Sequence, residues 1–226
     1  MDHRNNPNGL DEHMTNINSL ITGPAGQLEM LCEGFSPDSA PKAITVVCHP
    51  HPLHGGTMTN KVVHYLARSL RDLGLATIRF NFRGVGNSSG KHAQAIGETD
   101  DLLAVIDWVQ EHYPDTPLWL AGFSFGAYVA LRGVSQRPIE RLITIAPAVH
   151  LYDFSTLNLP ECPWLLIQGN ADEVVPPAEV VSWIKGLDRK PRTIYLKGVG
   201  HFFHGKLTLL REVLVTALGP AAKNLH

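Results

Sequence analysis

The five residues Gly122-Phe123-Ser124-Phe125-Gly126 could carry nucleophilic chemistry. They follow the apolar run 117–121 (PLWLA) and open the helical stretch 127–134 (AYVALRGV), so the serine stands at a turn from strand to helix. A side chain at so sharp a turn is held in a strained backbone conformation, and glycines two positions away on each side avoid collisions. The pattern predicts an exposed, reactive hydroxyl on Ser124. The alternative interpretation is a glycine-rich turn without chemistry.

A serine hydroxyl needs a general base, and two later loops carry the required residue types. Asp172 and His201 each come after an apolar, strand-like run, in the chain order serine, carboxylate, histidine. In such a set the carboxylate orients the neutral imidazole and stabilises its protonated form. Gly200 permits a tight turn just before His201 and favours it as the base. Glu173 and His204 are the alternative acid and the alternative base.

The acyl chemistry that these residues suggest also requires donors for a developing oxygen anion. The backbone amide of Phe125 lies at the start of the helix that follows Ser124. The positive end of a helix dipole favours negative charge at that place, so we expect this amide to contact the oxyanion.

Strands that alternate with helices are expected to position these loops. Before them, residues 19–35 alternate like an antiparallel edge hairpin. The βαβ order indicates an α/β fold with a mainly parallel central sheet and helices on both faces. The segment 150–163 is too short for a lid domain. The expected strands are 43–49, 75–82, 117–123, 141–149, 164–170 and 192–199, and the expected helices are 59–73, 100–113, 125–135, 178–187 and 206–218.

Length and composition limit the class of protein. The 226 residues are 44% hydrophobic and carry a net charge of −2, which suits one folded domain over 17–226 behind a polar arm, 1–16. The chain lacks the basic footprint of a nucleic-acid binder, and no expected helix carries a run of Lys and Arg for anionic lipid. No run reaches the ~18 apolar residues of a membrane span. The arm lacks a signal-peptide pattern, and three cysteines do not form a disulfide framework. We therefore expect a cytoplasmic monomer or homodimer whose partner is a small molecule.

Over residues 19–218 the sequence resembles the α/β-hydrolase superfamily, and within it the small lidless serine hydrolases near dienelactone hydrolases and short carboxylesterases. The motifs that carry the resemblance are 49–56 (HPHPLHGG), 83–88 (RGVGNS), the turn around Ser124, and the two loops with Asp172 and His201. The resemblance implies that these three residues are the nucleophile, acid and base, and that the turn 83–88 shapes the pocket floor. Dienelactone hydrolases use a cysteine in place of this serine.

The family's second oxyanion amide lies in the loop after the strand 43–49. Most relatives have His-Gly where this chain has His49-Pro50. Proline has no N–H to donate, so the resemblance places the second amide on His51, with Leu53 as the alternative.

Several side chains beside these positions are expected to line the pocket: His49, Leu53, His54, Phe123 and Phe202. The three histidines of the loop 49–54 also allow a metal hypothesis, but a fourth ligand is lacking and we expect no metal. The glycines of 83–90 lack the pattern of a nucleotide loop, so we expect no cofactor.

These residues predict a serine hydrolase that cleaves small carboxylic esters through an acyl-enzyme, in the manner of a carboxylesterase. The alternatives are a thioesterase, a peptidase or a perhydrolase with the same triad, and a catalytically silent binding protein of the same fold.

Overall fold

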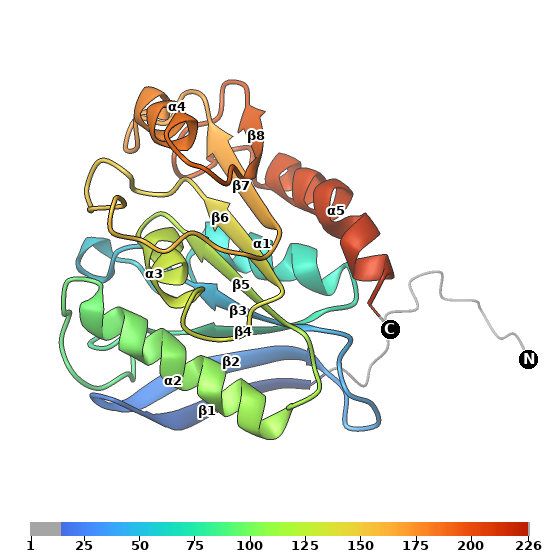
Figure 1. The fold of residues 1–226 in the computed structure, drawn as a ribbon. Helices are drawn as coiled ribbons and strands as arrows, with labels where there is room; N and C mark the ends of the chain where they lie inside the picture. Colours follow the sequence, from blue (N-terminus) through green and yellow to red (C-terminus); the bar gives the residue numbers. More distant parts are fainter. Residues whose placement is uncertain (1–14, 226) are drawn as a thin grey trace, which may run out of the picture.

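The computed structural model describes residues 15–225, and in them eight strands form one sheet in the order β1-β2-β4-β3-β5-β6-β7-β8 (Figure 1). Strands β3 to β8 pair in parallel, while β1 and β2 form an antiparallel hairpin whose second strand joins β4. The predicted α/β-hydrolase arrangement is confirmed. The strands are β1 (Thr15–Gly23), β2 (Gly26–Phe35), β3 (Ile44–Cys48), β4 (Ala76–Phe80), β5 (Leu118–Phe123), β6 (Arg141–Ile145), β7 (Trp164–Gly169) and β8 (Arg192–Leu196).

Helices cover both faces of the sheet (Figure 1). Helices α2 (Ile96–His112), α3 (Phe125–Gly133) and α4 (Pro177–Lys185) pack on one face, and α1 (Lys61–Arg71) and α5 (Leu207–Lys223) pack on the other.

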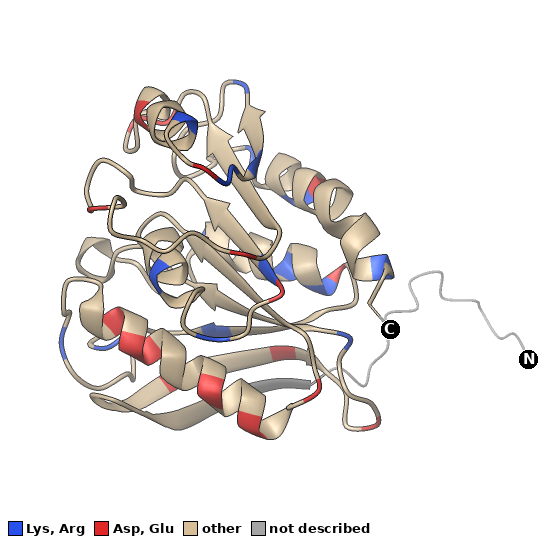
Figure 2. Cartoon of the chain, in the orientation of Figure 1, with Lys and Arg blue, Asp and Glu red and all other residues tan. Residues whose placement is uncertain are grey.

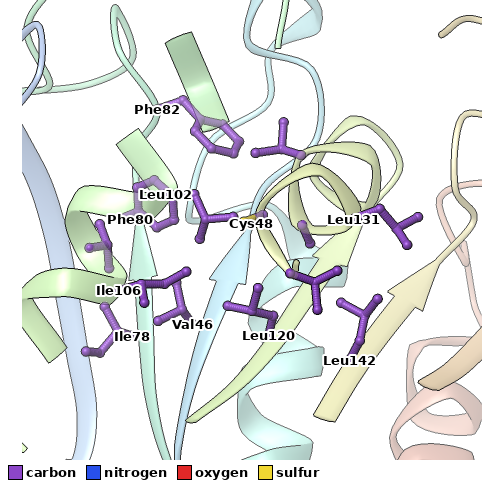
Figure 3. Packing of buried hydrophobic residues seen from close by; sticks show 14 of the residues in the cluster. Val46, Cys48, Ile78, Phe80, Phe82, Leu102, Ile106, Leu120, Leu131 and Leu142 are labelled. Carbon is purple, nitrogen blue, oxygen red and sulfur yellow. The ribbon is translucent and has the colours of Figure 1, made fainter. Parts of the chain in front are cut away.

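Two cores follow from this arrangement because successive strand residues point to opposite faces. Val46 and Leu120 belong to the core under α2 and α3, which Figure 3 shows, whereas Val47 and Ala121 belong to the core under α1 and α5. The central strands are buried on both faces, as their continuous apolar runs predicted.

Two helix boundaries differ by four or more residues from those expected. Helix α2 begins at Ile96, before the expected Asp100, because the Glu98 carboxylate accepts hydrogen bonds from two amides that precede the helix. Helix α5 continues past Leu218 to Lys223 although it contains Pro220. That proline removes one backbone hydrogen bond, but Ala222 is buried in the same core as Leu218, and this packing holds the last turn.

The carboxyl edge of the sheet carries no lid in the described part of the chain. Residues 146–163, which connect β6 to β7, contain no helix or strand. At the other end of the chain, Thr15 and Asn16 already belong to β1, and the rest of the expected arm, 1–14, lies outside the described residues. Over residues 15–225, none of the helices combines the length and hydropathy needed to cross a bilayer.

Candidate active site

Ser124 occupies the strained turn between β5 and α3. Its backbone angles are φ 55° and ψ −115°, outside the regions that residues with a side chain ordinarily adopt. A Cβ atom at Gly122 would overlap the carbonyl of Gly126, and one at Gly126 would overlap the carbonyl of Cys48 at the end of β3. Both glycines are therefore required by the close approach of backbone on either side of the serine.

A continuous hydrogen-bonded chain leads from this serine to a carboxylate. Ser124 Oγ lies 3.1 Å from His201 Nε2, and His201 Nδ1 lies 2.9 Å from Asp172 Oδ2. The three residues come from the loops after β5, β8 and β7, and each is at least nine-tenths buried. The structure brings the three expected residues together in the geometry that base-assisted attack by a serine requires.

The Asp172 carboxylate is held by donors on both of its oxygens. Oδ1 accepts hydrogen bonds from the amides of Val174 and Val175, and Oδ2 accepts one from Gln168 Nε2 as well as one from the His201 ring. Burial raises the pKa of Asp172, but these hydrogen bonds outweigh it, so the pKa lies below its ordinary value. The carboxyl therefore stays ionised opposite the imidazole. Sequence reasoning missed Gln168, although it is the lone amide in the apolar run of β7.

The two alternative residues hold other positions. The Glu173 carboxylate accepts a hydrogen bond of 3.2 Å from the backbone amide of His201, so it fixes the loop and does not contact the ring. The His204 ring is stacked on the exposed Phe202, with 5.8 Å between ring centroids. The imidazole of His201 thus pairs with Asp172, and the contacts favour these two residues as acid and base.

Two backbone amides near Ser124 are available for an oxygen anion. Phe125 begins α3, and the centroid of its ring lies 4.9 Å from that of the His51 ring. The turn at Ser124 and the loop after β3 are therefore side by side. The loop and cap hydrogen bonds between described residues include none donated by the amide of His51 or Phe125. The amide of Leu53, in contrast, donates to Nδ1 of His51 at 3.1 Å. Of the two alternatives for the second donor, His51 is therefore the one whose amide is free to bind an oxygen anion.

His49 does not line the pocket, contrary to expectation, because its ring turns into the core beneath the loop. Its Nδ1 lies 2.6 Å from the Pro50 carbonyl, and its Nε2 accepts a hydrogen bond from the amide of Phe82. Burial lowers the pKa of His49 to about 4, although the hydrogen bond to the Pro50 carbonyl acts in the opposite direction. With both ring nitrogens engaged, the imidazole stays neutral and fixes the start of the loop that carries His51.

This buried imidazole predicts an acid-dependent loss of stability. The pKa falls from 6.5 in the unfolded chain to about 4 in the fold, so between these values the unfolded chain binds the extra proton. The contribution of the neutral His49 to the free energy of unfolding is complete above pH 6.5. It falls by roughly 3 kcal/mol in all as the pH decreases towards 4. Denaturant unfolding at pH 7, 5.5 and 4 should show that the free energy of unfolding declines less for His49→Gln than for the wild type.

The control for this experiment is His150→Gln, which removes an exposed imidazole and should retain the decline of the wild type. Equal slopes for His49→Gln and the wild type would contradict the assignment of a buried, neutral His49.

A cavity of about 330 Å³ opens beside Ser124. Of the residues expected to line it, His54 and Phe202 do so, whereas Leu53 points into solvent with 70% of its surface exposed and Phe123 is fully buried behind His201. The expectation for Leu53 and Phe123 was therefore wrong. The lining residues are Pro50, His51, His54, Gly55, Gly56, Asn60, Ser124, Phe125, Ala148, Leu151, Tyr152, Val174, His201 and Phe202.

Sequence reasoning missed the residues that the loop after β6 contributes to this cavity. Leu151 and Tyr152 form part of its wall, and Val174, beside the candidate acid, forms another part. Their position after the carboxyl ends of strands was the available signal, since ligands bind at that edge of an open α/β sheet.

The turn 83–88 does not form the pocket floor, contrary to what the resemblance implied. Arg83 is tied to Asp101 of α2 by its backbone amide and its guanidinium, and Ser88 donates to the carbonyl of Asn81. The turn thus fastens the end of β4 to α2 and to the edge hairpin.

No group of three or more metal-binding side chains occurs between residues 15 and 225. The hypothesis of a three-histidine site in the loop 49–54 also conflicts with the geometry, because backbone groups occupy both ring nitrogens of His49. These residues do not offer a metal the ligands that it needs.

An eight-stranded, mainly parallel sheet with a strained serine at the carboxyl edge defines an α/β serine hydrolase. The comparison with protein families agrees: the chain belongs to the family described as Hydrolase_4, Serine aminopeptidase, S33, whose model matches residues 39–158.

Similar structures support the same class. An α/β serine hydrolase without a lid from Xanthomonas campestris is 42% identical, with a TM-score of 0.85, over 94% of this chain and 96% of that one. An α/β serine hydrolase homologue from Coxiella burnetii is 46% identical, with a TM-score of 0.85, over 91% of this chain and 98% of that one. The monoglyceride lipase of Homo sapiens is 29% identical over 126 residues, which are 53% of this chain and 40% of that protein.

Proposed function

We propose that this hydrolase cleaves small, uncharged carboxylic esters through an acyl-enzyme on Ser124. The observation that carries the proposal is the hydrogen-bonded chain Ser124–His201–Asp172 at the mouth of a small cavity. None of the described residues that line this cavity is Lys, Arg, Asp or Glu. An anionic or cationic substrate would therefore lose its hydration without gaining a charged partner.

The geometry supports a two-step reaction. Ser124 Oγ attacks the acyl carbon while His201 Nε2 takes its proton, and the amides of Phe125 and His51 bind the oxygen anion. His201 then gives the proton to the leaving alcohol. Water attacks the acyl-serine with His201 as base, which releases the carboxylic acid and returns the proton to Ser124. Asp172 stabilises the imidazolium in both steps.

The cavity volume sets the expected substrate size. At ~30 Å³ for each non-hydrogen atom, the volume that a water molecule takes in the liquid, about 330 Å³ holds roughly a dozen such atoms. A p-nitrophenyl ester of acetate or butyrate has about that size, whereas a palmitoyl chain is too long for the cavity and would extend into solvent. We expect kcat/KM to fall at least about tenfold between the butyrate and palmitate esters, as measured in a chain-length series below the micellar concentration.

The control for this series is Leu151→Ser, which removes an exposed apolar wall residue without touching Ser124. It should lower kcat/KM for the longer esters more than for acetate. A maximal kcat/KM at palmitate in the wild type would contradict the small-substrate proposal.

The family description raises aminopeptidase activity as a second candidate. A free amino terminus is cationic and binds best to a carboxylate. Glu173, the acidic residue next to Asp172, accepts a hydrogen bond from the His201 amide and lies outside the cavity lining. This contact favours ester over aminopeptide cleavage. Turnover of alanine p-nitroanilide faster than p-nitrophenyl acetate would reverse the order of the two candidates.

A further inference from the structure

A second cavity lies at the edge of the sheet opposite to Ser124. Its walls include Arg141 and Arg192, the first residues of β6 and β8, whereas the candidate catalytic residues follow the carboxyl ends of parallel strands. The volume is about 470 Å³. We call it the basic cavity; its lining residues are Arg141, Pro160, Glu161, Cys162, Pro163, Trp164, Leu165, Arg189, Lys190, Arg192, Ala217 and Leu218.

Positive charge is concentrated in this cavity. Arg141, Arg189, Lys190 and Arg192 face a single acidic lining residue, Glu161, in a chain whose net charge is −2. Figure 2 shows Lys and Arg at the start of β6 and of β8. Among the ion pairs formed by residues 15–225, none involves any of these four cations. No ion pair within the described chain therefore offsets their mutual repulsion.

Arg141 has a hydrogen-bond donor that is not satisfied within the described structure. Its Nε is buried and makes no hydrogen bond there, while its guanidinium lies over the Trp119 ring at 5.0 Å. Burial lowers the pKa of Arg141, and the positive charge of Arg192 acts in the same direction, whereas Cys162 and the Glu140 carboxylate act in the opposite direction. A buried donor without a partner is costly, and an oxyanion in the cavity would compensate the charge of the Arg141 guanidinium.

The remaining walls of the basic cavity are partly apolar and indicate that the ligand has an apolar part beside its charged groups. Trp164, Leu165 and Leu218 give the cavity an apolar part, and Pro163 adds to it. Arg192 donates one hydrogen bond to the Ala217 carbonyl, which holds its guanidinium beside this apolar surface. The arginine fork binds planar carboxylates and phosphates through paired hydrogen bonds.

We propose that the basic cavity binds an organic anion that carries two or more carboxylate or phosphate groups. Arg141 supplies the buried contact, and Arg189, Lys190 and Arg192 supply the surrounding charge. This site is separate from the cavity beside Ser124, and the proposal does not depend on the ester chemistry.

Isothermal titration calorimetry with pyrophosphate and with citrate tests the proposal, on the whole chain at low ionic strength, where screening is weak. We expect saturable binding of one anion per chain and a rise of the thermal unfolding midpoint on adding it. Binding of pyrophosphate alone identifies a phosphate ligand, binding of citrate alone a carboxylate ligand, and binding of both the shared oxyanion chemistry.

Matched variants locate the site. Arg141→Gln should weaken binding about tenfold or more, because it removes a charged donor from the cavity. Lys190→Gln, an exposed change that spares the fold, should weaken it about threefold, whereas Lys91→Gln removes an exposed charge outside the cavity and should leave the affinity unchanged. Absence of saturable binding, or equal weakening by Lys91→Gln and Lys190→Gln, overturns the proposal.

Discussion

Replacing Ser124 with alanine is expected to lower kcat for p-nitrophenyl acetate by roughly 10⁴- to 10⁶-fold, because the acyl-enzyme can no longer form. The hydroxyl oxygen is the only non-hydrogen atom removed, and the turn already holds its residue at φ 55°. Alanine fits the same backbone, so the variant should fold. The proposed oxyanion donors, the amides of Phe125 and His51, remain, and we expect them to account for the residual rate above that of water.

Initial rates at saturating ester measure this effect, and mass spectrometry after treatment with a fluorophosphonate probe provides an independent readout. The wild type should gain one adduct on Ser124, and Ser124→Ala should gain none. Ser182→Ala, which changes an exposed serine of α4, is the matched control and should retain both rate and adduct. If Ser124→Ala kept a tenth of the wild-type rate, the nucleophile would have to be another residue.

The fold was predictable because each central strand can be recognised from its own local sequence. β3, β5 and β7 are short apolar runs buried on both faces. Because helical segments lie between them in the sequence, a parallel sheet with helices on both sides is the arrangement that buries the two faces of each strand. The helix ends were less predictable. The start of α2 depends on the Glu98 carboxylate, and the end of α5 depends on burial of Ala222 in a core built from distant residues.

The candidate triad was predictable for a topological reason. Parallel strands bring the loops after β5, β7 and β8 to one edge, so the chain order of serine, carboxylate and histidine selects these three loops as the site. The choice between Asp172 and Glu173 was not predictable, since both lie in one short loop. It depends on which carboxylate faces the imidazole, and the amides of Val174 and Val175 determine that orientation.

The pocket wall was the least predictable part, because irregular loops have no side-chain periodicity. His49 and His51 are two residues apart, yet one ring turns into the core and the other lines the cavity. The difference arises in the segment just after β4, where the Phe82 amide donates a hydrogen bond to the His49 ring and Asn81 accepts one from the Met58 amide. Contacts from one segment, distant in the sequence, thus hold both ends of the loop that presents the His51 amide.

The second large effect is expected for Asp172→Asn, which should lower kcat by about 10³- to 10⁴-fold while the fold persists. The amides of Val174 and Val175 bind Oδ1 and would select the oxygen of the asparagine for that position. The NH₂ group must then face the His201 ring in place of Oδ2. A donor there stabilises the tautomer whose Nε2 carries the proton, and that nitrogen cannot take the proton of Ser124.

Glu173→Gln is the matched control, because it neutralises the neighbouring carboxylate of the same loop. Its side-chain oxygen still accepts the hydrogen bond from the His201 amide, so kcat should fall less than about tenfold. Steady-state rates of the two variants on one short ester, with thermal unfolding to verify folding, separate a carboxylate that orients the imidazole from one that holds the loop. A larger loss for Glu173→Gln than for Asp172→Asn would reverse the assignment, since the negative charge opposite His201 would then come from Glu173.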